Sequence, residues 1–490
     1  MGDGVPTPLA SETPTVSKYP REEECSRYWV QRMVGQGMSS TLYNGSGSDQ
    51  DDNVGAPARM AREMNREAAE NIYKRIYLGF HSNAGSGSSR GCIGLYNNST
   101  LFPGTATPNQ FRWAQIIGQE LNDDMVGIGA PPLEVAWFNK GSNITLARSD
   151  YAFGEINNNT IIEVSYHDNV SDSQLMRDPK VRNWVARTSL QAVVKYMNEF
   201  DGLPLNFLPE PPTNVRAVAN GTGGIVISWA VPTSSAGSGA ATSYVVYRST
   251  DGYGFGNPVT VSGGGTTSTT LTGLSADVDY YFRVAAVNAG GESMPSETVG
   301  CRRASVATTP KALFVNGYDR MGRFANLRQS LTTTNYTAPG NSGTFERVLT
   351  RTANTFDYVV QHGKAISAYG MPFDTCQNEA VINGQVSLSS YAAVIWACGN
   401  ESTVDETFSS AEQTLVINYL NANGNIFVSG SEIAWDLDRA SGPTTADRAF
   451  FNNNLRAKLL NNTHDNSQSW SFSAATGSIF AGNATGAFDD

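Results

Sequence analysis

Residues 1–207 contain apolar positions at helical spacing that alternate with short apolar runs. The helical spacing predicts helices after Pro20, over residues 57–72 and 111–121, and from Pro179, with Asp178 as its candidate cap. The short runs predict strands over residues 75–80, 92–96 and 160–165. Alternation of these two periods indicates an α/β domain in which helices cover a sheet.

Residues 209–304 have a different pattern, with short apolar segments separated by Gly, Ser and Thr. The clearest segments are residues 225–229 and 244–247, and their spacing predicts an all-β sandwich. Proline-containing segments at residues 208–213 and 304–310 flank this zone and favour extended spacers between domains.

From residue 311 the alternation returns, which predicts a doubly wound α/β domain around an open parallel sheet. The expected strands are residues 312–315, 357–360, 392–396 and 426–428, and a helix carries Leu415 to Leu420 and ends near Gly424. The chain is therefore a multidomain protein with predicted domains at residues 1–208, 209–304 and 305–490.

Composition narrows the classes of partner. The chain has 490 residues, 16% charged residues and a net charge of −11, and its Lys and Arg residues do not cluster. These features argue against binding to nucleic acid or to an anionic membrane surface. No apolar run reaches the ~20 residues of a membrane span, and the polar N-terminus does not have the pattern of a signal peptide. If the protein is exported, we expect either that its signal lies upstream of this chain or that its export route is unusual.

Five cysteines are present, and none has C-x-x-C spacing, which argues against a cysteine-based zinc site. An odd number leaves at least one thiol unpaired or paired between chains. Cys376 and Cys398 are candidates for a disulfide in an exported protein.

Two residues of the first zone point to chemistry. His81 stands at the end of a hydrophobic strand, where ligand sites open in such sheets. Glu163 lies inside the apolar strand 160–165. A buried carboxylate is costly unless it is paired, protonated or close to a cation, so a nearby metal would explain it.

The stretch Phe80-His81-Ser-Asn-Ala84, followed later by Ile162-Glu163 and by residues 172–179 before a long helix, resembles the zinc-dependent N-acetylmuramoyl-L-alanine amidases. This resemblance covers about residues 20–200. It implies that His81 is a zinc ligand and that Glu163 is the general base and acid. It also implies an extracellular or envelope enzyme that cleaves the glycan–peptide amide bond of peptidoglycan.

The sequence departs from this family at its beginning. No histidine precedes His81, and the acidic run Glu22–Glu24 matches the family's second ligand poorly. The chain is therefore expected to lack the family's first strand and first metal ligands, and zinc is expected to be absent unless they are supplied. The alternative function is a non-catalytic extracellular wall-binding or structural protein with a degenerate amidase domain.

Two other polar features have structural as well as functional interpretations. His167 follows Glu163 in the next loop and would contact substrate or make a surface hydrogen bond. Asp51 and Asp52 are interpreted as a helix-entry region rather than as ligands.

The middle zone resembles a fibronectin type III module. Trp229, the segment Leu274 to Val284 and the loop Asn288 to Ser296 carry the resemblance. It implies that Trp229 and Leu274 fill the core and that the Tyr280 hydroxyl bonds to the backbone. Fold alone does not define function, so a spacer or a weak wall contact is the expected role.

The last zone resembles class I glutamine-amidotransferase-like α/β domains in residues 316–320 and 428–436. In the position of their nucleophile this chain has Ser431 followed by Glu432, and His362 and His464 are the available partners. Catalysis there requires a base within hydrogen-bond reach. The favoured interpretation is a buried polar network that contains Asp319, Arg320, Glu432 and Asp436.

Overall fold

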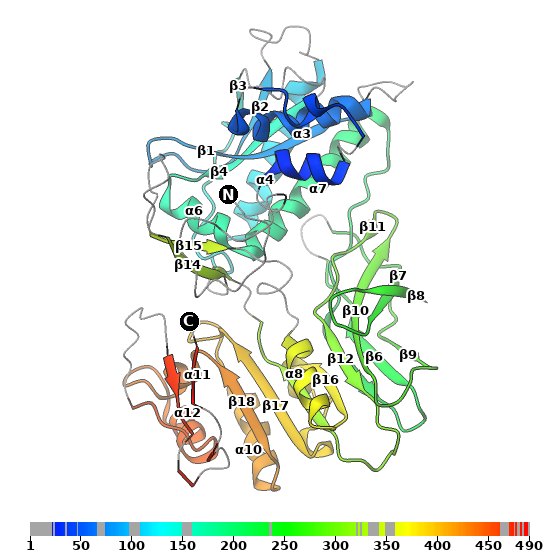
Figure 1. Cartoon of the computed structure of the whole chain (residues 1–490), viewed down its shortest axis with the longest axis vertical. Helices are drawn as coiled ribbons and strands as arrows, with labels where there is room; N and C mark the ends of the chain where they lie inside the picture. Colours follow the sequence, from blue (N-terminus) through cyan, green and yellow to red (C-terminus); the bar gives the residue numbers. More distant parts are fainter. Residues whose placement is uncertain are drawn as a thin grey trace.

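A computed structural model shows an N-terminal α/β region, a middle β sandwich and a C-terminal α/β region, which are called here the N-terminal, middle and C-terminal domains (Figure 1). The structure describes residues 22, 25–34, 37–46, 48–65, 74–97, 108–148, 159–234, 238–319, 322–323, 326–331, 343–347, 358–460, 470–474, 476–477, 481–482 and 485–488. Glu23, Glu24, Ala68, Ile72, Arg320, Asp357 and His464, which the sequence analysis considered, lie outside these ranges.

The N-terminal domain has a four-stranded mixed sheet in the order β1-β4-β2-β3. Its strands are β1 (Tyr77–Asn83), β2 (Ile93–Asn97), β3 (Thr145–Arg148) and β4 (Asn159–Tyr166). β1 runs parallel to β4, and β2 runs antiparallel to β4. All three predicted strands are therefore present, with ends shifted by one to three residues.

Helices cover both faces of this sheet. The helices are α2 (Ser26–Trp29), α3 (Asp49–Asn65), α4 (Pro108–Ile128), α6 (Val170–Arg177) and α7 (Pro179–Asp201), with short turns η2 (Val30–Val34) and η3 (Ser40–Leu42). α4 and α7 pack their apolar residues against Ile162 and Val164 on one face. α3 places Ala58 against Ile161 on the other face.

Local signals explain where two of these helices begin. Asp178 caps α7 by accepting a hydrogen bond from the Lys180 backbone, as predicted. The helix predicted from Pro57 begins eight residues earlier, because Pro57 lies inside α3. A proline cannot donate to the carbonyl four residues before it, and here the Asn53 carbonyl accepts the Ser26 hydroxyl instead. α2 therefore supplies the donor that the proline lacks.

The middle domain is an antiparallel β sandwich around Trp229, Tyr244, Phe282 and their neighbours. Its strands are β5 (Thr213–Ala219), β6 (Ile225–Ala230), β7 (Ser243–Ser249), β8 (Gly256–Ser262), β9 (Ser268–Leu271), β10 (Asp279–Asn288), β11 (Gly291–Glu292) and β12 (Val299–Arg302). The Tyr280 hydroxyl accepts a hydrogen bond from Ser275 N at 3.1 Å, and Leu274 is buried in the core. These contacts confirm the structural roles predicted for Trp229, Leu274 and Tyr280.

The C-terminal domain contains four parallel strands in the order β18-β17-β13-β16. They are β13 (Ala312–Asn316), β16 (Phe373–Gln377), β17 (Ala393–Gly399) and β18 (Ile426–Gly430). Around them lie α8 (Tyr358–Ala368), α9 (Asn378–Ile382), η7 (Leu388–Ser390), α10 (Ser410–Asn421), α11 (Ile433–Asp438), α12 (Thr445–Ala449) and η8 (Phe450–Asn454).

Two predictions for this domain are wrong. Residues 358–360 belong to α8 rather than to a strand, because Val359 and Val360 pack as one helical face on Phe314 and Phe373. Cys376 and Cys398 are free and buried, because they lie on β16 and β17 with β13 between these strands.

The middle and C-terminal domains share one continuous sheet. The edge strand β16 pairs antiparallel with β12 and with β5 of the sandwich. Asp374 of β16 is fully buried and accepts hydrogen bonds from Ala219 N at 2.8 Å and from the Tyr391 hydroxyl at 3.0 Å. The segment 304–310 therefore connects two domains that are in direct contact, rather than acting as a spacer.

A second contact joins the C-terminal domain to the N-terminal domain. The guanidinium of Arg323 binds both carboxylate oxygens of Glu134, at 2.6 and 2.8 Å. Asn326 Nδ2 donates to the Arg177 carbonyl at the end of α6. Asn326 leads directly into the hairpin of β14 (Leu327–Leu331) and β15 (Gly343–Arg347), which lies below α6 in Figure 1. A separate short hairpin, β19 (Trp470–Phe472) with β20 (Gly486–Phe488), follows near the C-terminus.

Candidate functional site

His81 and Glu163 occupy the same register position on the neighbouring parallel strands β1 and β4. Side chains at paired positions point to the same face of a sheet, and neighbouring strands are about 4.8 Å apart. Both residues are partly exposed near the carboxyl ends of their strands. The structure therefore brings together the two residues that the sequence analysis selected.

An apolar and an aromatic residue are among the other neighbours of Glu163. Ile93 is its register partner on β2, and Tyr166 follows on the same strand. Burial raises the pKa of the Tyr166 hydroxyl, and the negative charge of Glu163 adds to the rise. Lys140 lies over the Tyr166 ring, with its ammonium 5.2 Å from the ring centre. Glu163 therefore has the apolar Ile93 and the phenol of Tyr166 among its neighbours.

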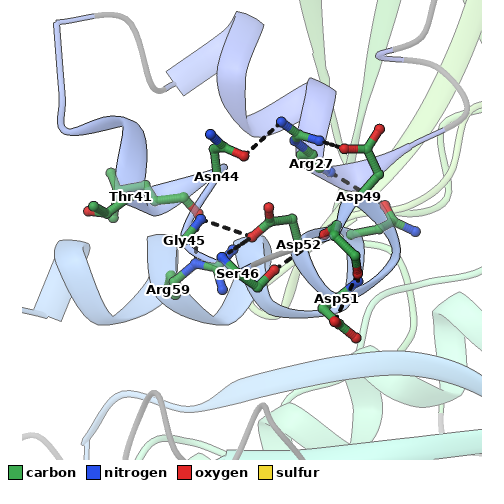
Figure 2. Close-up of polar contacts among 12 residues, drawn as sticks. Arg27, Thr41, Asn44, Gly45, Ser46, Asp49, Asp51, Asp52 and Arg59 are labelled. Atoms are coloured by element: carbon green, nitrogen blue, oxygen red, sulfur yellow. Dashed lines mark hydrogen bonds and ion pairs between the residues drawn. The ribbon is translucent and has the colours of Figure 1, made fainter.

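α2 and α3 are held over this face by a buried carboxylate, Asp52 (Figure 2). Asp52 Oδ1 accepts hydrogen bonds from the backbone N–H groups of Gly45 and Ser46, both at 2.9 Å, and pairs with Arg59 at 2.6 Å. Arg59 also donates to the Leu42 carbonyl. Asp52 is therefore a structural residue at the start of α3, as the sequence analysis expected.

A cavity of about 870 Å³ opens beside His81 at the outer edge of β1. Residues of α3, including Val54 and Pro57, line one wall, and Val181, Arg182 and Val185 of α7 line the opposite wall. Burial lowers the pKa of Arg182 in this wall. Phe80 lies at the edge of the cavity with 55% of its side chain exposed. The cavity combines an apolar surface with His81 and one guanidinium.

The loops after β1 and β4 are fastened to each other by carboxylates. Asp168 accepts hydrogen bonds from Gly85 N and Gly87 N at 2.9 Å, which lower the pKa of its carboxyl. Asp172 is buried, pairs with Arg90 at 2.8 Å and accepts from Gly91 N. The segment that resembled the closing element of an amidase therefore fixes the loop after β4.

His167 is exposed, and its Nδ1 lies 3.1 Å from Ser82 Oγ. Because Ser82 and His81 are consecutive on β1, their side chains point to opposite faces of the sheet. His167 therefore has the surface hydrogen bond that was one of its two interpretations. Its contact is not on the face that carries Glu163.

The surroundings of His81 and Glu163 do not complete a zinc site. A catalytic zinc requires three protein ligands as well as a water. Among the residues that the structure describes, no group of three or more His, Cys, Asp or Glu side chains is placed to hold a metal ion. The described residues therefore do not fit a catalytic zinc.

The candidates in the C-terminal domain are dispersed. Ser431 Oγ contacts the Gly399 carbonyl at 3.3 Å and the Asn400 side chain at 3.4 Å. His362 lies on α8, stacked on Phe314 with ring centres 4.8 Å apart, and burial lowers its pKa. Asp436 accepts from Thr407, whereas the backbone of Asp319 donates to Glu401. The expected network of Asp319 with Asp436 is not supported by these contacts.

Sequence analysis missed the residues around Asp319. Glu401 is the second residue after β17, and Glu379 is the second residue after β16. Their position after the carboxyl ends of parallel strands was a usable signal. Glu297 joins them from the sandwich, and sequence spacing alone gives no reason to place it there.

Comparisons with known proteins identify the middle domain. Residues 210–302 match the fibronectin type III domain, which confirms that interpretation. A stretch of 103 residues is 36% identical to Chitinase A1 of Niallia circulans and covers 21% of this chain and 13% of that protein. The chain thus spans only a small part of the length of this curated relative.

Solved structures with similarity cover the same share of the chain. A fibronectin type III-like protein from Clostridium thermocellum is 28% identical and has a TM-score of 0.17, over 20% of this chain and 96% of that chain. The FN5 domain of Drosophila Lar is 23% identical, with a TM-score of 0.17, over 20% of this chain and 100% of that chain.

No described helix is both long and apolar enough to cross a membrane.

Proposed function

We propose that this chain is an extracellular hydrolase that acts on bacterial peptidoglycan and cleaves the amide bond between glycan and peptide. The observation that carries the proposal is the pairing of His81 with Glu163 on one sheet face, beside an open cavity. The fibronectin type III domain and the similarity to a protein named as a chitinase support a location outside the cell.

Glu163 is the proposed proton carrier. In this role its carboxylate takes a proton from water as the water adds to the amide carbonyl, and it then passes that proton to the leaving amine. The apolar residues Ile93 and Ile161 lie beside Glu163 on β2 and β4. His81, on the next strand, is placed to contact the same substrate group.

A second candidate function is wall binding without hydrolysis. The specific observation in its favour is that the described residues do not supply three metal ligands around His81. In that case the cavity with Phe80 and Arg182 would hold a wall peptide, and Glu163 would have no chemical role.

For the C-terminal domain we propose a class I glutamine-amidotransferase-like fold without catalysis. The strand order supports the fold. Among the described residues, Ser431 bonds to Gly399 and Asn400 whereas His362 stacks on Phe314, which supports the absence of a nucleophile and base pair there.

The test uses the whole chain with purified peptidoglycan sacculi. Release of soluble peptides with new amino termini is measured for the wild type, for Glu163→Gln and for Glu199→Gln as a surface control. Loss of a general base is expected to slow release by about a hundredfold or more, while the control keeps full activity. Equal rates for the wild type and Glu163→Gln would reject the proposed role of Glu163.

Two further measurements separate the candidate functions. Co-sedimentation with sacculi without peptide release would favour the binding protein. Elemental analysis of the wild type and of His81→Ala measures zinc directly. Stoichiometric zinc that is lost in His81→Ala would identify His81 as a ligand, and zinc in neither protein would exclude a zinc enzyme.

A further inference from the structure

Three parallel strands of the C-terminal domain end at one cluster of oxygen-rich side chains. The chain adds β16 on one side of β13 and then crosses to add β17 on the other side. Ligands of open parallel sheets bind outside the carboxyl ends of strands at such a crossing. We call the residues at this place the switch-point cluster: Glu297, Asn316, Asp319, Asn378, Glu379 and Glu401.

Contacts between these side chains define the cluster. Asn316 ends β13, and its Nδ2 donates to Glu297 Oε2 at 2.6 Å. The Asp319 backbone donates to Glu401 Oε1 at 2.6 Å. Asn378, directly after β16, donates to Glu412 Oε1 at 2.9 Å and also interacts with the carboxyl of Asp319. Side chains from both domains therefore meet at one place.

Two buried asparagines of the cluster each have a side-chain oxygen that accepts no hydrogen bond. Asn316 and Asn378 are both 8% exposed, and the Oδ1 atom of each lacks a hydrogen-bond partner. Glu379 Oε2 is a third buried oxygen without a hydrogen-bond partner. A buried acceptor without a hydrogen-bond partner destabilises the folded state. Three such atoms in one cluster indicate that a ligand donates hydrogen bonds to them.

The charges in the cluster are of one sign. Burial, together with the charges of Asp319, Asp405 and Glu412, raises the pKa of Glu401 to about 9. The pKa of Glu297 is raised by burial and by Asp319 and Glu379. The charges that act most strongly on these two residues are thus all carboxylates. A cationic ligand would relieve this repulsion.

The cluster is open on one side. Asp319 is exposed and Glu297 and Glu379 are partly exposed, whereas Glu401 is only 3% exposed. We infer that the switch-point cluster binds a primary ammonium group, with the buried asparagine oxygens as acceptors and with Glu401 and Asp319 as its carboxylates.

The kinds of acceptor in the cluster favour an ammonium group over a bare metal ion. Among the described residues, no group of three or more His, Cys, Asp or Glu side chains is placed to hold a metal ion. An ammonium group has three donors, which amide oxygens and carboxylates can accept together, and it needs no closed ligand shell. This site is separate from the pair of His81 and Glu163, and it does not depend on the function proposed for them.

Isothermal titration of the whole chain tests the inference, with glucosamine hydrochloride as the ammonium probe and N-acetylglucosamine as its uncharged control. The buffers contain no primary amine. We expect glucosamine to bind and N-acetylglucosamine not to bind. Glu401→Gln and Asp319→Asn should each weaken binding by about tenfold or more, because each removes a charge-assisted hydrogen bond. Glu292→Gln, on the exposed surface of the sandwich, is the matched control and should bind as the wild type.

Proton release is an independent readout. At pH 7.5 the binding of an ammonium group should displace a proton from Glu401, so the binding heat should change between buffers of different ionisation enthalpy. The inference is overturned if both sugars bind alike, if neither binds, or if Glu401→Gln and Asp319→Asn bind glucosamine as the wild type. It is also overturned if magnesium or calcium chloride binds while glucosamine does not.

Discussion

The Thr375 hydroxyl binds both backbone groups of Gly300 across the boundary between two domains. It accepts a hydrogen bond from Gly300 N at 2.7 Å and donates one to the Gly300 carbonyl at 2.8 Å. Thr375 belongs to β16 of the C-terminal domain, and Gly300 belongs to β12 of the fibronectin type III domain. One side chain thus supplies two of the hydrogen bonds that join these domains.

Replacement of this hydroxyl should weaken the junction. Thr375→Val keeps the shape of the side chain but leaves the buried N–H and C=O of Gly300 without partners, which should cost about 1–3 kcal/mol in the free energy of unfolding. Denaturant unfolding of the whole chain measures this loss. Thr375→Ser keeps the hydroxyl and should lose clearly less stability than Thr375→Val. A loss in Thr375→Ser as large as that in Thr375→Val would contradict the dominant role given to the hydroxyl.

The C-terminal domain should lose stability as pH rises. The pKa of Glu401 is raised to about 9 from an ordinary value of 4.5, so the folded chain holds this proton more tightly than the unfolded chain does. The stabilisation is complete below about pH 4.5 and is lost as pH rises towards 9, at up to ~1.4 kcal/mol per pH unit. Glu401→Gln is neutral throughout this range.

Thermal unfolding between pH 5 and pH 9, in buffers without primary amines, checks this expectation. The wild type should lose more stability than Glu401→Gln over the interval. Parallel curves for the two proteins would mean that Glu401 does not titrate in this window.

The ion pair of Glu134 with Arg323 should restrict the motion of the N-terminal domain relative to the C-terminal domain. Glu134→Ala removes both contacts and should raise the population of separated arrangements by about fivefold, the equivalent of ~1 kcal/mol for a surface pair. Small-angle scattering or distance measurements between spin labels would detect this change. Glu199→Ala breaks the pair with Arg112 within one domain and is the control. An identical distance distribution in Glu134→Ala and the wild type would contradict the prediction.

Thiol reactivity should separate Cys25 from the other four cysteines. Cys92, Cys301, Cys376 and Cys398 are buried, and burial raises the pKa of each thiol, to about 12 for Cys92. Cys25 is only partly buried. A thiol reagent at pH 8 should therefore modify one cysteine in the folded protein and five in denaturant. Only three reactive thiols in denaturant would reveal a disulfide that the structure does not contain.

Local signals in the sequence were sufficient for much of the fold. Asp178 and Pro179 mark the start of α7, and the alternation around Trp229 marks the sandwich. The error at residues 358–360 has a physical cause, because a short apolar run fits a buried strand and a buried helix equally well. Only the packing of Val359 and Val360 on Phe314 decides for the helix.

Some residues of the candidate sites could also be predicted from the sequence, and others could not. His81 and Glu163 were found because each stands out within its own strand, and the strand register then placed them side by side. Glu297 could not be found, because its place beside Asn316 depends on how two domains pair their sheets. Long-range pairing of this kind leaves no periodic pattern in the chain.

Sheet pairing at the boundary has a consequence for the use of the fibronectin type III domain as a movable module. Without β12 and β5, strand β16 would be the edge of its sheet, with unpaired backbone groups of the buried, uncharged run Thr375 to Gln377 facing solvent. Such edges recruit strands from other molecules. The sandwich thus covers this edge strand and prevents self-association through it. A chain divided near residue 305 would give an aggregation-prone C-terminal fragment rather than an independent domain.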